Sequence, residues 1–140
     1  MNPDRTTKLI LRLDAAFCLA LALPGLLASG WLAGFLLPGQ PGLFGFSMAT
    51  VMLEVGILLA AYAVLLFVMS LRPTVNRGFL AFTAIGDALW VLGTVALLVL
   101  AGPAFSLWGG IVLLVVAADT GLLGLWKWRA LRGSAAAVHA

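Results

Sequence analysis

The chain has few charged residues: 9% of its 140 residues are Asp, Glu, Lys or Arg, whereas 64% are hydrophobic. Its mean hydropathy is +1.17. A soluble domain usually has about 25% charged residues, so this composition indicates an integral membrane protein. The formal net charge of +3 does not indicate nucleic-acid binding, because the eight basic residues are split between the two ends and the middle of the chain.

Cysteine and histidine are nearly absent, with one of each. Cys18 alone cannot form an internal disulfide, a CxxC pair or a Cys/His metal site. His139 lies in the small-residue segment 133–140, which we expect to be a flexible, solvated tail. The sequence therefore predicts no metal site and no histidine chemistry. We also expect no cofactor, and the absence of nucleophile-base pairs favours a protein that is not an enzyme.

Long apolar runs predict an all-α protein with four transmembrane helices, at about 9–37, 48–71, 79–101 and 105–126. Two prolines and two glycines within residues 38–42 form the first turn, Arg72-Pro73 ends the second helix, Gly102-Pro103 ends the third, and Lys127 ends the fourth. Pro24-Gly25 predicts a kink in the first helix. Residues 1–132 are then a single domain, a four-helix bundle.

The basic residues also predict the orientation of the bundle. All eight lie at the two termini and in the second connection, while the first and third connections contain none. Because cytoplasmic connections are enriched in Lys and Arg, we expect both termini to face the cytoplasm.

Four of the five acidic residues, Asp14, Glu54, Asp87 and Asp119, lie inside the apolar runs. A carboxylate in hydrocarbon costs at least a few kcal/mol, so such residues usually face the bundle interior, a water-filled cavity or a partner. With a rise of about 1.5 Å per residue, Asp14, Asp87 and Asp119 lie within about 15 Å of the cytoplasmic edge, and Glu54 lies near the outer boundary.

The cytoplasmic half is thus predicted to contain an intramembrane polar cluster of Arg12, Asp14, Asp87, Trp90 and Asp119. Arg12 is the basic residue expected to reach these acids. One guanidinium cannot neutralise three acids, so at least one of Asp87 and Asp119 is expected to hold a proton unless another cation reaches it. The alternative is that each acid only fixes helix packing, with Arg12 and Asp14 as an interfacial ion pair.

A second, outer site is predicted from Ser47, Thr50 and Glu54, which share one stripe at helical spacing. Near the inner cluster, Cys18 lies one turn after Asp14 on the same helix face and is expected to hydrogen-bond it. Tyr62, in the middle of the second helix, needs a partner for its hydroxyl, and Asp87 is a candidate.

Small residues at helical spacing predict close helix packing within the bundle or a dimer face. They are Gly30 and Gly34 in the first helix, Gly86 and Gly93 in the third, and Gly121 and Gly124 in the fourth.

Three motifs resemble those of a widespread family of small, uncharacterised bacterial four-helix membrane proteins: Leu-Arg-Leu-Asp-Ala at 11–15, Leu-Arg-Pro at 71–73 and Gly-Asp-Ala-Leu-Trp at 86–90. Asp87 stands where that pattern tends to have Asn, which implies that the position requires a polar, hydrogen-bonding group. The resemblance implies a fold and the bacterial cytoplasmic membrane, but no activity. A fainter likeness to DoxX-like proteins rests on architecture alone.

Three functions are consistent with these features of the sequence. The first is a non-enzymatic accessory subunit or binding protein, whose polar pocket contacts a partner helix, a lipid or a pigment. The second is a small proton- or cation-coupled transporter that uses Asp87, Asp119 and Glu54 as relay groups. The third is an enzyme acting on a lipid or isoprenoid, with Asp87 and Asp119 as acid and base. The expected partners are membrane lipids, a larger membrane complex or a second copy of the chain.

Overall fold

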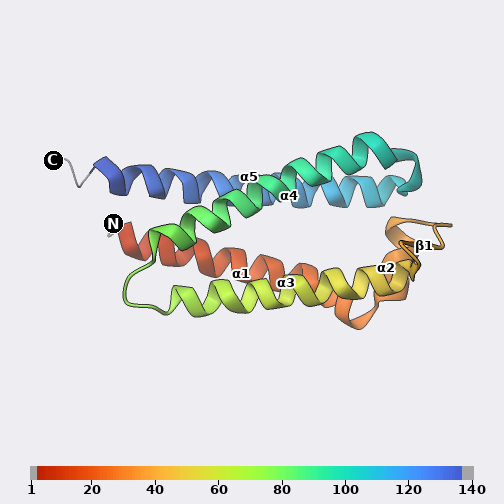
Figure 1. Ribbon diagram of the computed structural model, residues 1–140, viewed down its shortest axis with the longest axis horizontal. Helices are drawn as coiled ribbons and strands as arrows, with labels where there is room; N and C mark the ends of the chain where they lie inside the picture. Colours follow the sequence, from red (N-terminus) through yellow and green to blue (C-terminus); the bar gives the residue numbers. More distant parts are fainter. Residues whose placement is uncertain (1–2, 137–140) are drawn as a thin grey trace.

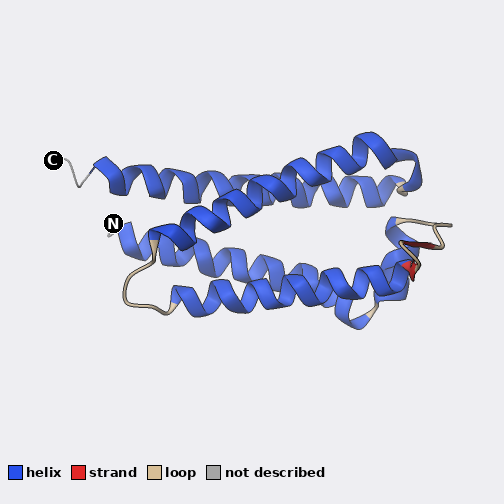
Figure 2. Cartoon of the chain, viewed as in Figure 1, coloured by secondary structure: helices blue, strands red, loops and turns tan. Residues whose placement is uncertain are grey.

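The computed structural model describes residues 3–136 and contains four helices long and apolar enough to cross a membrane (Figures 1 and 2). The long helices are α1 (Pro3–Leu27), α3 (Met48–Ser70), α4 (Arg77–Ala101) and α5 (Leu107–Ala136). A short helix, α2 (Ser29–Leu36), follows α1, and a single 3-10 turn, η1 (Gly102–Ala104), joins α4 to α5. The expected all-α bundle of four transmembrane-length helices is confirmed, and the side of the membrane that each end faces stays a prediction.

The helices form two antiparallel pairs, one of α1 and α2 with α3, and one of α4 with α5 (Figure 1). The two pairs meet chiefly through α1 and α5. A core cluster joins them near the first turns of α1, where Leu11, Ala63, Leu66 and Leu80 are buried together. From this end α4 diverges from α3 along its length, while the start of α1 and the end of α5 stay at the same end of the molecule (Figure 1).

The expected kink near Pro24 is present as a break between α1 and α2. Ala28 leaves the helical region, with φ −146° and ψ 43°. Its N–H still donates to the carbonyl oxygen of Pro24 at 2.9 Å, and its own carbonyl oxygen accepts from the N–H of Leu32 at 2.9 Å. The chain therefore changes direction without leaving these backbone groups unpaired.

The turn expected after the first helix is a small β-hairpin of β1 (Gly42–Leu43) and β2 (Phe46–Ser47). Both residues of its two-residue loop have positive φ, 51° at Phe44 and 84° at Gly45. Such turns match the twist of the strands, and glycine adopts this conformation without strain, unlike a bulky residue. At the same end of the molecule, Ser106 donates from its Oγ to the carbonyl oxygen of Phe35 at 2.5 Å.

The glycines that allow close packing are mostly not the expected ones. A Cβ added to Gly56 would lie 3.0 Å from the backbone of Gly25, and one added to Gly109 would lie 2.7 Å from the carbonyl oxygen of Leu36. Gly124, one of the expected positions, faces Asp87. In contrast, a Cβ at any of four expected positions would meet nothing within 4 Å: Gly30, Gly34, Gly86 and Gly93.

The fourth long helix does not end at Lys127. α5 continues to Ala136, so Lys127 lies inside it and residues 133–136, expected to belong to the tail, are helical. Residues 137–140, including His139, lie outside the described part of the chain. A single Lys in an otherwise helical run did not stop the helix, because Lys is itself a good helix former.

Candidate functional site

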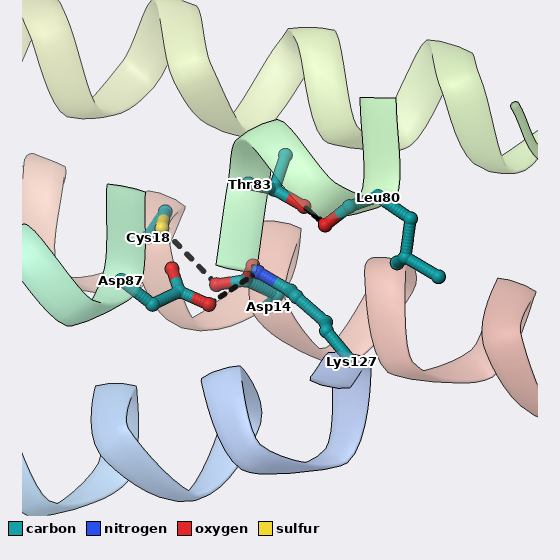
Figure 3. Close-up of polar contacts among 6 residues, drawn as sticks. All are labelled: Asp14, Cys18, Leu80, Thr83, Asp87 and Lys127. Carbon is teal, nitrogen blue, oxygen red and sulfur yellow. Dashed lines mark hydrogen bonds and ion pairs between the residues drawn. The ribbon is translucent and has the colours of Figure 1, made fainter. Parts of the chain in front are cut away.

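Lys127 lies between two carboxylates that come from different helices (Figure 3). Its Nζ donates to Asp14 Oδ2 from α1 and, at 2.7 Å, to Asp87 Oδ2 from α4. The three residues are almost completely buried, with exposed fractions of 0% for Lys127, 2% for Asp14 and 4% for Asp87. We call these three residues the charged triad. It connects the two helix pairs, because Asp14 belongs to one pair and the other two residues belong to the second.

The course of α5 explains why Lys127 points inward. Side chains on a helix lean toward its N-terminus, so the lysine chain extends toward the middle of α5 and away from its C-terminal end. Gly124, one turn earlier, leaves space for Asp87, whose Cβ would lie 3.0 Å from a Cβ added at that glycine. Because Gly124 has no side chain, α4 can approach α5 closely enough for the Asp87 carboxylate to reach the Lys127 ammonium group.

The triad carries one positive and two negative charges when all three groups are ionised. Burying an unpaired charge is very costly, and an ion pair offsets that cost only when its remaining groups are also hydrogen-bonded. One further bond is present, since the Cys18 Sγ donates to Asp14 Oδ1 at 3.6 Å, as the sequence predicted. With two carboxylates and one ammonium group, the triad has one more acidic group than basic groups inside the bundle.

Arg12 does not serve as the cation of the cluster. Its side chain is exposed, and its Nε lies 3.4 Å from the Oγ of Ser70 on α3. Lys127 takes the place expected for Arg12, and among the described residues it is the only buried basic side chain. A signal for this was present in the sequence: Lys127 continues the spacing of Val116, Thr120 and Gly124 along one face of the helix.

Asp119 stands apart from the triad, whereas Trp90 lies beside it without a hydrogen bond to it among the described residues. Asp119 is exposed on α5, and within residues 3–136 it has no hydrogen bond or ion pair. Trp90, 39% exposed, lies on α4 one turn after Asp87. The buried cluster thus contains Asp14 and Asp87 of the expected residues, together with Lys127, which the sequence predicts only as the end of the helix.

The predicted outer site forms in part. Ser47 caps the start of α3: its Oγ accepts from the backbone N–H of Thr50 at 3.2 Å and lies 2.9 Å from the Thr50 hydroxyl. Glu54, one turn further, is exposed and does not join these bonds. Ser47 and Thr50 are thus a helix cap, and within residues 3–136 no further side chain hydrogen-bonds to them.

A cavity of about 270 Å³ lies beside the triad, lined by residues of α1, α3, α4 and α5. Asp14, Cys18 and Asp87 form its polar end. Its walls are mainly apolar and include Phe17, Leu21, Val55, Leu58, Leu59 and Trp90. Leu58 and Trp90 are also exposed at the surface, on α3 and α4 respectively, so the cavity opens between these two diverging helices.

Tyr62 lines the same cavity, and its hydroxyl is buried without a hydrogen-bond partner among the described residues. The expected bond to Asp87 is therefore absent, because Asp87 pairs with Lys127. Thr83, one turn before Asp87, bonds instead to the carbonyl oxygen of Leu80 at 3.0 Å (Figure 3). An unpaired buried hydroxyl costs about 1–3 kcal/mol, which makes Tyr62 the unsatisfied group of this site.

Comparisons of the chain with protein-family models, curated proteins and solved structures gave no match. The resemblance to small bacterial four-helix proteins therefore stays a prediction. What the structure itself shows is an integral-membrane type of bundle with a buried charged triad and a cavity that opens on its side.

Proposed function

We propose that this protein is a non-enzymatic membrane protein that binds a single-chain lipid or isoprenoid by its polar head. The observation that carries the proposal is the unpartnered Tyr62 hydroxyl in a laterally open, apolar cavity that ends at two carboxylates. Ligand pockets commonly combine mostly apolar walls with a few converging polar groups. A ligand head would supply the hydrogen bond that the protein does not.

The chemistry of the polar end indicates the kind of head group. Carboxylate oxygens of Asp14 and Asp87 only accept hydrogen bonds when ionised, while the Tyr62 hydroxyl can donate or accept. Lys127 satisfies one oxygen of each carboxylate. A hydroxyl or amine head can donate to a remaining acidic oxygen and accept from or donate to Tyr62. A phosphate head would meet two negative charges and is disfavoured.

The size and position of the cavity favour a ligand with a single hydrocarbon chain. A volume of about 270 Å³ lies just below the range of about 300–1,000 Å³ typical of small-molecule pockets. Because the opening lies between α3 and α4 at membrane depth, the rest of a long ligand can remain among the lipid chains. The ligand can therefore enter sideways without crossing water.

A substitution at Gly86 can test the proposed lipid binding, because Gly86 lines the cavity and a Cβ there would meet nothing within 4 Å. Gly86→Leu should fill the opening without disturbing the packing of α4. Gly93→Leu is the matched control, since Gly93 lies seven residues later on nearly the same face, is equally open and does not line the cavity.

The measurement is mass spectrometry of lipids that remain with protein extracted together with its native membrane. We expect one single-chain hydroxyl or amine lipid to be enriched on the wild-type protein and on Gly93→Leu, and to fall at least about tenfold on Gly86→Leu. Equal lipid profiles for the two variants would refute the proposed binding.

A proton- or cation-coupled transporter is the second candidate, favoured by the extra acid in the triad. The arrangement does not support a relay through Asp119, which is exposed and separate from Asp87. The same separation argues against Asp87 and Asp119 as the acid and base of an enzyme. In proteoliposomes, proton-coupled uptake that is abolished by Asp87→Asn and kept in Gly86→Leu would favour transport over lipid binding.

A further inference from the structure

Asp119 is an exposed acid near the middle of a membrane-spanning helix. It lies ten residues before Arg129, which is also exposed, so it stands about 15 Å from that basic end of α5. This is half of a hydrocarbon core about 30 Å thick. An acidic side chain at the centre of a span costs about 3 kcal/mol or more, so a single copy of the chain leaves this group in an unfavourable environment.

The residues around Asp119 form a regular stripe. Val112, Val115, Asp119, Leu122 and Trp126 follow one another at alternating intervals of three and four residues, and all five are exposed. This spacing is that of a seam along which two transmembrane helices pack at a small crossing angle. We call these five residues the α5 seam.

The α5 seam does not face the other helices of its own chain. Gly121 faces Val91 of α4, since a Cβ added there would lie 3.7 Å from Val91 Cγ2. Asp119 lies two residues earlier and so about 200° around the helix from that contact. Within residues 3–136 no cation is available to it, because the one buried basic side chain, Lys127, already bonds to Asp14 and Asp87.

We propose that the α5 seam is the docking face for a transmembrane helix of a different protein, one that carries a Lys or Arg at the level of Asp119. Charge complementarity selects this occupant. A second copy packed on the same seam around a two-fold axis would bring two Asp119 carboxylates together, which is unfavourable. Lipid would supply no positive charge at this depth. This inference is independent of the proposed lipid binding, because Gly86 and the cavity lie on another face.

The test is photo-cross-linking in native membranes from p-benzoylphenylalanine placed at Leu122, next to Asp119 on the seam. The expected adduct is a transmembrane peptide of another protein with a Lys or Arg within its span. Asp119→Asn in the same background should lower the adduct yield about tenfold or more, whereas Asp119→Glu should keep it. The same probe at Val64, an exposed position on α3, should not give this adduct.

Four results would overturn the proposal: an adduct with a second copy of this chain, adducts with lipid only, a partner peptide without a basic residue in its span, or an unchanged yield for Asp119→Asn. The identity of the cross-linked peptide is read with Asp119 intact, so it decides the matter even where Asp119→Asn fails to accumulate. Gly86→Leu should keep the adduct, which separates a failure of this proposal from a failure of lipid binding.

Discussion

Lys127 is the residue on which the charge balance of the buried region depends. It is fully buried, and it directs its ammonium group away from the nearby end of α5 instead of toward water. Long basic side chains near helix ends usually extend to the interface. Here the Lys127 side chain extends inward instead, because without it the buried carboxylates of Asp14 and Asp87 would have no cation beside them among the described residues.

Replacing Lys127 by Met should therefore destabilise the protein strongly. Removing one partner of a buried ion pair costs about 3–5 kcal/mol, because the other charge remains buried. Thermal unfolding in detergent is the measurement, and Arg129→Met, at an exposed position, should lose less than about 1 kcal/mol. Adding Asp14→Asn and Asp87→Asn to Lys127→Met should restore most of the loss. A Lys127→Met protein as stable as Arg129→Met would contradict the triad.

Removing the polar group of Tyr62 should have a different effect on stability from removing that of Lys127. Because its hydroxyl has no partner within residues 3–136, Tyr62→Phe should leave the free energy of unfolding of lipid-free protein unchanged or raise it by about 1 kcal/mol. The same change should reduce recovery of the bound lipid, since the head group loses its hydrogen bond. Chemical unfolding in detergent and lipid mass spectrometry test the two halves. A loss of stability above about 1 kcal/mol would show that the hydroxyl already has a partner.

At the scale of the helices, close contact between α1 and α3 depends on Gly25 and Gly56. Gly56→Val should destabilise the pair by about 1–3 kcal/mol, because its Cβ would lie 3.0 Å from the backbone of Gly25, which cannot move aside. Gly34→Val, at an open position, is the matched control. Thermal unfolding midpoints compare the two, and equal midpoints would mean that the helices are not in this close contact.

Sequence periodicity predicted the helices well and the site only in part. Unbroken apolar runs place the helices, because a membrane allows few alternatives to a hydrogen-bonded helix. Asp14 and Asp87 were found because acids inside such runs need partners. Lys127 was missed because a basic residue at the end of an apolar run is normally an interfacial stop. Asp119 lies at a similar depth but outside the cluster, because the rise per residue predicts the depth of a side chain and not the side of the bundle that it faces.

At the scale of the whole molecule, the distribution of basic residues predicts which side each connection faces. Both ends and the connection at 71–76 should be cytoplasmic, and the hairpin connection at 37–47 should be external. In a Cys18→Ser background, a membrane-impermeant thiol reagent added to intact cells should label Gln40→Cys and not Thr74→Cys. Both replaced side chains are exposed, so accessibility does not bias the comparison. Labelling of Thr74→Cys and not of Gln40→Cys would show that the protein has the opposite orientation in the membrane.

The charged triad also connects the two helix pairs, which otherwise meet chiefly through α1 and α5. Solid-state NMR of isotopically labelled protein in lipid bilayers can measure the coupling between the Lys127 Nζ nitrogen and nearby carboxyl carbons. We expect Nζ to couple to the carboxyl carbons of both Asp14 and Asp87, with one coupling lost in each Asp→Asn variant, and to show none with Asp119. An Nζ that couples to neither Asp14 nor Asp87 and exchanges freely with water would contradict the buried triad and, with it, the polar end of the cavity.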